Sequence, residues 1–112
     1  LGQAAARRGK GLAFAHEAGK LIWGGAENWH EGDHLAGAAM RAGLDLTELD
    51  AEAIADAEVL DAEIHANQAA LEAGGHWGVP TLVFDGEPFF GQDRIEMVLW
   101  RMQQKGLEKR SA

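Results

Sequence analysis

The spacing of apolar residues predicts helices over most of the chain before Gly75. The larger apolar residues recur there at steps of three and four, which places them on one face of a helix. Glycines and capping residues divide this part into four predicted helices. These are a helix over residues 3–23, a short helix that Asp33 caps and Gly43 stops, a helix that opens at a capping box over residues 47–50, and a longer helix over residues 56–73 with Val59, Leu60, Ile64 and Leu71 facing inward.

The pattern then changes to that of a β-hairpin. Residues 81–84 form a short run of β-branched, apolar and aromatic side chains, which is typical of a strand. Asp85 and Gly86 tolerate the positive φ angles of a two-residue turn. Residues 87–90 can return antiparallel to the first run. This stretch therefore predicts a two-stranded hairpin.

A last helix is predicted over residues 93–105, with Asp93 as its cap. One face of this helix carries Ile95, Val98, Leu99 and Met102, and we expect it to pack on the hairpin. Two strands alone make a marginal sheet, so the hairpin must extend a larger sheet or pair with another chain. Because the chain starts at Leu1 within a polar lead-in to a helix, we expect a fragment of a longer domain.

Composition narrows the classes of protein that fit this pattern. The chain has 112 residues, enough for one small domain, and 46% of them are hydrophobic. Much of that share is alanine, which buries little area, so we expect a thin core that rests on the larger apolar residues. A formal charge of −8 argues against nucleic acid and anionic membranes as partners.

Targeting and redox signals are absent from the sequence. It shows no membrane span and no secretory signal, and a cytoplasmic location is the expectation. The absence of cysteine excludes a disulfide framework, a thiolate metal site and a Cys-x-x-Cys centre within these residues. The run from His30 to His34 matches the H-E-x-x-H zinc pattern, but Gly32 and Asp33 inside it signal a helix break. We predict no metal site.

Three segments carry a resemblance to a known family. They are Gly-Val-Pro-Thr at 78–81, the Asp-Gly turn of the hairpin, and Phe-Gly-Gln-Asp-Arg at 90–94. Together they resemble the C-terminal part of the 2-hydroxychromene-2-carboxylate isomerases, relatives of the kappa-class glutathione transferases in the DsbA-like branch of the thioredoxin superfamily. The likeness continues back through residues 29–32, residues 42–44 and the helix that contains Asn67.

The resemblance implies a fold class and two parts of the chain. The class is α/β, a thioredoxin-like (DsbA-like) fold with an all-helical insertion, of which this chain is mostly helix with one β-hairpin and a C-terminal helix. Residues 1–74 would be the helical insertion domain. Residues 75–112 would be the C-terminal ββα half, and the N-terminal βαβ half would be absent.

The resemblance also implies a site for glutathione. Val79, before a cis Pro80, would offer its backbone to the cysteinyl part of the ligand, although cis is only about 5% of X-Pro bonds in folded proteins. Gln92 and Asp93 stand at a helix start that attracts anions, and they would hold the γ-glutamyl end. The alternative reading of Asp93 is that it is only an N-cap.

An aromatic substrate is the remaining expectation. Trp29 and Trp77 would line its pocket, and ordinary packing is the alternative for each. The implied function is a glutathione-dependent isomerase or transferase, acting on an unsaturated aromatic acid by reversible glutathione addition. Its catalytic residue would lie upstream of this chain. Two alternatives stay open: a DsbA-like thiol-disulfide oxidoreductase, and a non-catalytic helical interaction fragment that forms a homodimer through its hairpin edge.

Overall fold

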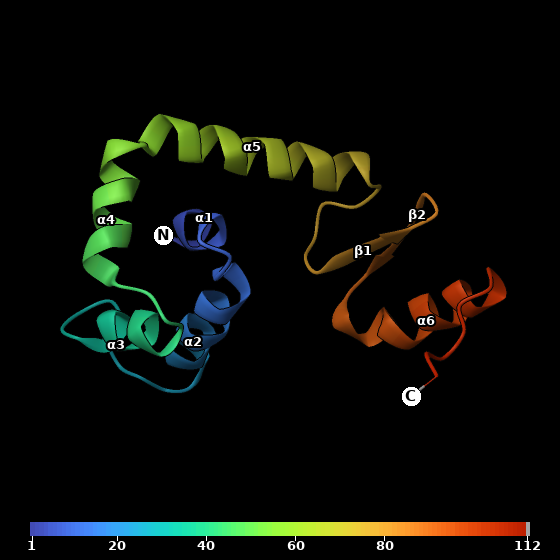
Figure 1. Cartoon of the computed structure of the whole chain (residues 1–112), viewed down its shortest axis with the longest axis horizontal. Coiled ribbons are helices and arrows are strands. Elements are labelled where there is room, and N and C mark those ends of the chain that lie inside the picture. The colour runs from blue at the N-terminus through green and yellow to red at the C-terminus, as the bar shows by residue number, and fades with distance from the viewer. Residues whose placement is uncertain (112) are drawn as a thin grey trace. The chain divides into compact units, whose positions relative to one another are not determined.

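The computed structural model describes residues 1–111, and helices make up most of it (Figure 1). It forms two compact units, residues 1–64 and the residues from His65 onward. No helix in the described part of the chain is both long and apolar enough to cross a membrane. The elements are α1 (Gly2–Arg7), α2 (Gly11–Trp23), α3 (His34–Arg41), α4 (Leu46–Ala55), α5 (Ala57–Ala73), β1 (Thr81–Phe84), β2 (Glu87–Phe90), the 3₁₀ turn η1 (Gln92–Arg94) and α6 (Ile95–Gln104).

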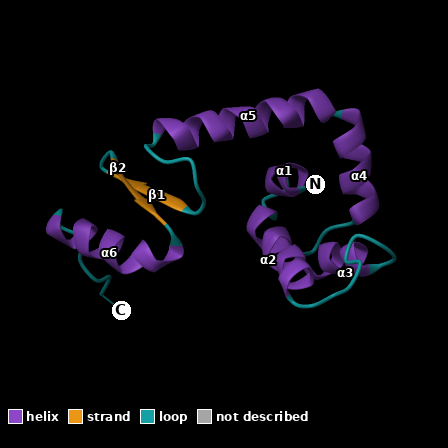
Figure 2. Ribbon diagram, turned by 180° about the vertical axis from the view of Figure 1, so that it is seen from behind, coloured by secondary structure: helices purple, strands orange, loops and turns teal. Residues whose placement is uncertain are grey.

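The predicted hairpin is confirmed at both strands, which Figure 2 shows as the only strands of the described residues. β1 and β2 pair antiparallel, with Thr81 opposite Phe90 and Phe84 opposite Glu87. Asp85 and Gly86 have φ angles of 51° and 78°, which are the positive values of a type I′ turn. The turn residues therefore set the register of the sheet.

The prediction of one helix over residues 3–23 is wrong, because two helices, α1 and α2, occupy that stretch. Gly9 has a φ of +70°, a left-handed conformation that ends α1. The N–H of Lys10 then donates to the carbonyl of Ala5 at 2.9 Å, which closes the helix end. The chain restarts at Gly11 as α2.

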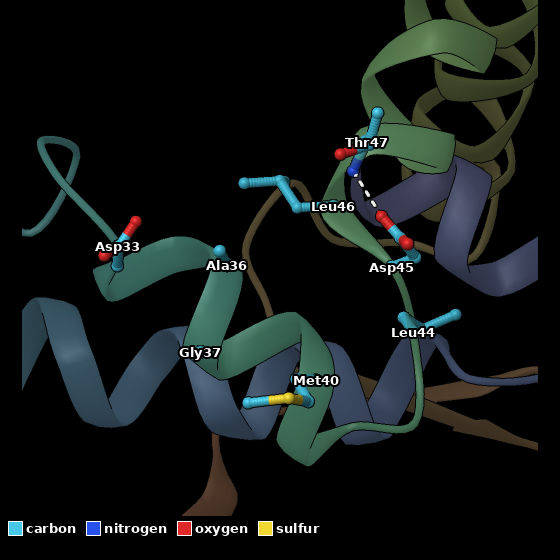
Figure 3. A pocket seen from close by; sticks show the side chains of 8 residues that line it. All are labelled: Asp33, Ala36, Gly37, Met40, Leu44, Asp45, Leu46 and Thr47. Carbon is cyan, nitrogen blue, oxygen red and sulfur yellow. Dashed lines mark hydrogen bonds between the residues drawn. The ribbon is translucent and has the colours of Figure 1, made fainter.

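Two predicted caps also need correction. Helix α4 begins at Leu46, and its N-cap is Asp45, whose carboxylate accepts from the N–H of Thr47 at 2.8 Å (Figure 3). The capping box over residues 47–50 is therefore wrong. Asp33 does stand at the N-cap of α3, but its side chain makes no capping hydrogen bond. The predicted stop at Gly43 is confirmed by its φ of +78°.

The core of the first unit is built largely from alanine, contrary to the expectation that larger residues would carry it. Leu49 is fully buried and Phe14 nearly so. Val59 and Ile64 of α5, which were expected to face inward, are about half exposed, and Leu60 alone of the predicted set is buried. Small side chains let the short helices approach closely. The buried cluster consists of Ala4, Ala5, Phe14, Ala39, Ala42 and Leu49.

Ion pairs join α1 to the two helices that follow α3 in the first unit. Arg7 pairs with Glu63 at 2.7 Å and with Glu52 at 3.3 Å, and Arg8 also pairs with Glu52. The hydrogen bond from Arg8 holds the pKa of Glu52 below its ordinary value of 4.5, and hydrogen bonds from Arg7 and Gln3 do the same for Glu63. These carboxylates are therefore kept charged in the folded unit.

The second unit consists of the hairpin, α6 and the end of α5. Phe89 lies opposite Leu82 in the register, and Phe89 is buried, as is Val98 of α6. Val83 and Pro88 form the adjacent pair, whose side chains point to the other face of the sheet. Of the face predicted to pack on the hairpin, only Val98 is buried, while Ile95 and Leu99 are about half exposed.

Candidate functional site

A short loop between α5 and β1 carries the Val79-Pro80 peptide, and this peptide bond is cis, as the resemblance implies. Two hydrogen bonds hold the loop from within. The N–H of Gly78 donates to Nδ1 of His76 at 2.8 Å, and the hydroxyl of Thr81 donates to the carbonyl of Gly78 at 2.6 Å. Both backbone polar groups of Gly78 are therefore engaged, which orients the residue directly before Val79.

Three aromatic rings gather around Gly78. The imidazole of His76 stacks on Phe90 with ring centroids 4.1 Å apart and planes 9° apart, and its other neighbour is Trp77 at 5.3 Å. A β-carbon added at position 78 would lie 2.5 Å from Cε2 of Phe90. Glycine is therefore required here because the ring of Phe90 occupies the space of a side chain.

Val79 differs from Gly78 in that its peptide groups are open. Within the described residues, neither its N–H nor its C=O has a hydrogen-bond partner. Val79 is 75% exposed. β1, which follows it, pairs only with β2 among the described strands, so the loop leads into a strand with one free edge. An extended peptide could add to such a backbone by strand-like hydrogen bonding.

A pocket of about 560 Å³ lies beside this loop. Trp77, which is 80% exposed, forms part of its wall together with Val79 and Pro80. The structure thus brings three of the predicted site residues into one pocket. No residue that lines it carries a charge, so its polar groups are hydroxyl and carboxamide groups. The lining is Asn67, Gln68, Leu71, Trp77, Val79, Pro80 and Thr81.

Gln92 and Asp93 are joined to the loop through the backbone. The N–H of Gly91 donates to the carbonyl of Pro80 at 2.9 Å, which continues the hairpin pairing by one residue. Gln92 and Asp93 follow at once in η1, and both are exposed. They do not line the pocket of Trp77. The cis-proline and the start of the last helix are therefore neighbours across the end of the hairpin.

The predicted capping role of Asp93 is wrong. The N-cap of α6 is Arg94, and no side chain makes a capping hydrogen bond there. Asp93 instead points its Oδ1 back toward Gly91, where an added β-carbon would lie 2.5 Å away. Gly91 also has a φ of +101°, a backbone conformation that L side chains rarely adopt, so glycine is favoured here. The carboxylate of Asp93 is exposed and does not serve the helix.

Trp29 lies in the first unit, apart from the other predicted site residues in the chain. It is half-buried, and its ring meets that of His30 edge-on with centroids 5.7 Å apart. Its participation in a substrate pocket with Trp77 stays a prediction.

The H-E-x-x-H run does not lie on one helix. Gly32 has a φ of +60°, and α3 begins only at His34. Both histidines of a zinc site of this type must stand on the same helical face. Among the described residues, no group of three His, Asp or Glu side chains is placed to hold a metal ion.

The structure brings to the site residues that the sequence did not assign to it. His76 and Phe90 hold the loop, and Asn67 and Gln68 supply the carboxamides of the pocket. The position of His76 directly before Trp77 could have indicated from sequence that His76 lies near the site. The stack of His76 on Phe90 could not be predicted, because 14 residues separate the two in the chain.

A second pocket, of about 410 Å³, lies between α3 and the start of α4 in the first unit (Figure 3). Met40 and Leu46 contribute apolar side chains to its lining, and Asp33 and Thr47 contribute polar ones. None of the predicted site residues lines it.

The described residues are mostly helical, with one antiparallel β-hairpin and a C-terminal helix. A comparison with protein families assigns this arrangement. The chain matches the DSBA-like thioredoxin domain over residues 1–103, and it belongs to that family. No curated protein and no solved structure matches it. The division into an insertion over residues 1–74 and a ββα half over residues 75–112 stays a prediction.

Proposed function

We propose that this chain carries the glutathione-binding part of a glutathione-dependent isomerase of the 2-hydroxychromene-2-carboxylate isomerase type. The observation that carries the proposal is the open peptide of Val79, held in place by a fixed Gly78 and adjacent to the exposed Gln92 and Asp93. Membership of the DSBA-like family supports a thiol or glutathione as the ligand.

The cysteinyl part of glutathione would bind along Val79. Its N–H and C=O would replace the missing partners of the Val79 peptide, as an added strand does. Hydrogen bonds of this kind depend on backbone position and not on the side chain of residue 79. The site therefore depends on what fixes the loop.

The γ-glutamyl end would bind at the start of the last helix. Free N–H groups there attract its carboxylate, and Gln92 adds a carboxamide donor. The ammonium group would pair with Asp93, whose exposed carboxylate is not used as a helix cap. Loss of the capping role strengthens the case for a ligand role.

The aromatic substrate would lie against Trp77 in the uncharged pocket. Bound glutathione would supply the nucleophile, a thiolate that adds reversibly to the double bond of an unsaturated aromatic acid and so permits rotation about it. Trp77 and the carboxamides would orient the ring. The resemblance implies that the residue that activates the thiol would lie outside this chain.

A thiol-disulfide oxidoreductase is the second candidate, and family membership favours it equally. This chain has no cysteine, so the redox centre would have to be supplied from elsewhere. Reduction of insulin disulfides by the full-length protein, with no response to S-methylglutathione, would favour this candidate over the isomerase.

Thermal unfolding of the full chain with and without glutathione tests the proposal. Wild-type protein should melt several degrees higher with saturating glutathione, since 1 kcal/mol shifts the Tm of a small domain by about 4–8 °C. Asp93→Asn should reduce this shift and leave the ligand-free Tm unchanged. Asp50→Asn, an exposed carboxylate in the first unit, is the matched control. Equal shifts in all three proteins would contradict the assigned role of Asp93.

A further inference from the structure

We propose that His76 is a positioning residue for the glutathione loop, and that ligand binding at Val79 requires the unprotonated Nδ1 of its imidazole. The inference rests on the proposed function and concerns how protonation of His76 would regulate binding at the same site. His76 itself would not touch glutathione. It would act through Gly78.

The first observation is the hydrogen bond within the loop. Gly78 is buried, and its N–H donates to Nδ1 of His76 at 2.8 Å. The carbonyl of Gly78 accepts from Thr81 at 2.6 Å. The bond from Thr81 orients the peptide plane that the carbonyl of Gly78 shares with the N–H of Val79, and the bond to His76 orients the peptide plane on the other side of Gly78. A change at Nδ1 therefore reaches Val79 through the backbone rotations of Gly78.

The second observation is that the imidazole is held in its position from two sides. Phe90 stacks on it at 4.1 Å and is itself fixed in β2 opposite Thr81. Trp77, which lines the uncharged pocket beside Val79 and Pro80, stacks on it with ring centroids 5.3 Å apart. His76 thus supplies two separable things, a ring for stacking and an acceptor for the N–H of Gly78.

Protonation removes the acceptor and keeps the ring. An imidazolium carries hydrogen on both nitrogens and can only donate. The buried N–H of Gly78 would then lose its partner, which costs more than the bond itself contributes. The charged side chains that share pockets with His76 are Glu72 of α5, Glu87 of β2 and Arg94 of η1. Glu87 is paired with Arg101 at 2.8 Å, which leaves charges of opposite sign at Glu72 and Arg94.

Two substitutions separate the acceptor from the ring. Asparagine at position 76 can accept from the N–H two residues on, as in an Asx turn, but it has no ring. Phenylalanine keeps the stack on Phe90 and has no acceptor. A positioning role predicts that His76→Asn binds within about threefold of wild type and that His76→Phe binds about tenfold more weakly.

The probe is S-methylglutathione, because its blocked sulfur does not titrate. Calorimetry on the full chain should show wild-type affinity falling toward the His76→Phe value on acidification, because an imidazolium at position 76 cannot accept from the N–H of Gly78. The affinity of His76→Asn should not change on acidification. A flat wild-type profile, or His76→Phe binding as tightly as wild type, would overturn the inference.

A measurement without ligand separates this inference from the proposed function. The amide resonance of Gly78 should shift with pH in wild type and stay constant in His76→Asn. If the Gly78 resonance shifts but S-methylglutathione binds at no pH, the proposed function is wrong and the positioning of Gly78 by His76 is supported. If S-methylglutathione binds and the Gly78 resonance is constant, the proposed function is supported and the positioning role of His76 is wrong. The wild-type profile and His76→Asn suffice if His76→Phe does not fold.

Discussion

The two units differ in how their side chains are used. The first unit has a connected core of alanines with Leu49 and Phe14, and ion pairs from Arg7 and Arg8 join its helices. The second unit buries only Phe89 and Val98 among its larger apolar residues in the described part of the chain. It leaves the peptide of Val79 open. The first unit is more closely packed, and the second leaves open the backbone groups to which we propose that the ligand binds.

The difference shows where substitutions should affect stability and where they should affect binding. A two-stranded sheet contributes little stability by itself, so its order depends on local contacts such as the ring stack at Gly78. The helical unit depends on close packing instead. The predictions below test this division, beginning with the largest effect.

Leu49→Ala should destabilise the first unit by about 2–5 kcal/mol, because Leu49 is fully buried and its removal leaves a cavity. Urea unfolding followed by circular dichroism measures the loss. Leu12→Ala is the matched control, since Leu12 is 90% exposed and its substitution should change stability by less than about 0.5 kcal/mol. Similar losses for the two variants would contradict the assigned core.

Gly78→Ala should cost about 1–3 kcal/mol, because the new β-carbon overlaps the ring of Phe90. The effect should appear as displaced Phe90 and Trp77 resonances and as weaker S-methylglutathione binding. Gly2→Ala, which has nothing within 4 Å of its added β-carbon, is the control and should bind normally. Normal binding by Gly78→Ala would show that the loop is not fixed through this contact.

Asp45→Ala should destabilise the first unit by about 1 kcal/mol, because α4 loses the bond from the N–H of Thr47. Asp45→Asn keeps an acceptor and should be close to wild type. Thr47→Ala should be nearly neutral, since the hydroxyl of Thr47 does not cap α4. A larger destabilisation by Thr47→Ala than by Asp45→Ala would instead support the capping box over residues 47–50.

Acid should weaken the first unit through Glu52, Glu63 and Glu17. Contacts with Arg8, Arg7 and Lys20 respectively lower the pKa of each carboxyl from 4.5 in the folded state. Their stabilising contribution is therefore complete above pH 4.5 and is lost as the pH falls through the lowered values. The urea midpoint measured between pH 7 and pH 3 should fall less in Glu52→Gln than in wild type. Glu48→Gln, an exposed residue on the same helix, should follow the wild-type curve.

The hairpin could be predicted from sequence to the residue, and the loops around it could not. Asp85 and Gly86 determine their own turn by local conformational preference. The break at Gly9 was missed because the alanines and arginines before it favour helix, and glycine inside a helical pattern is often tolerated. Asp45 was missed as a cap because Thr47 offered a competing start two residues later.

The candidate site was predictable in part for a similar reason. Val79, Pro80, Gln92 and Asp93 belong to short motifs that can be read along the chain. The roles of Gly78 and His76 depend on the ring of Phe90, which reaches them only through the pairing of β1 with β2. The absence of a capping bond at Asp93 likewise depends on the 3₁₀ turn before α6, which no residue pattern marks.

The most direct test of the proposed binding site is an NMR titration of the ¹⁵N-labelled full chain with glutathione. We predict shifts at the amides of Val79, Gln92 and Asp93 that saturate together, with none at Leu49 in the core of the first unit. Shifts of equal size across both units, or no saturable shift at Val79, would contradict the account.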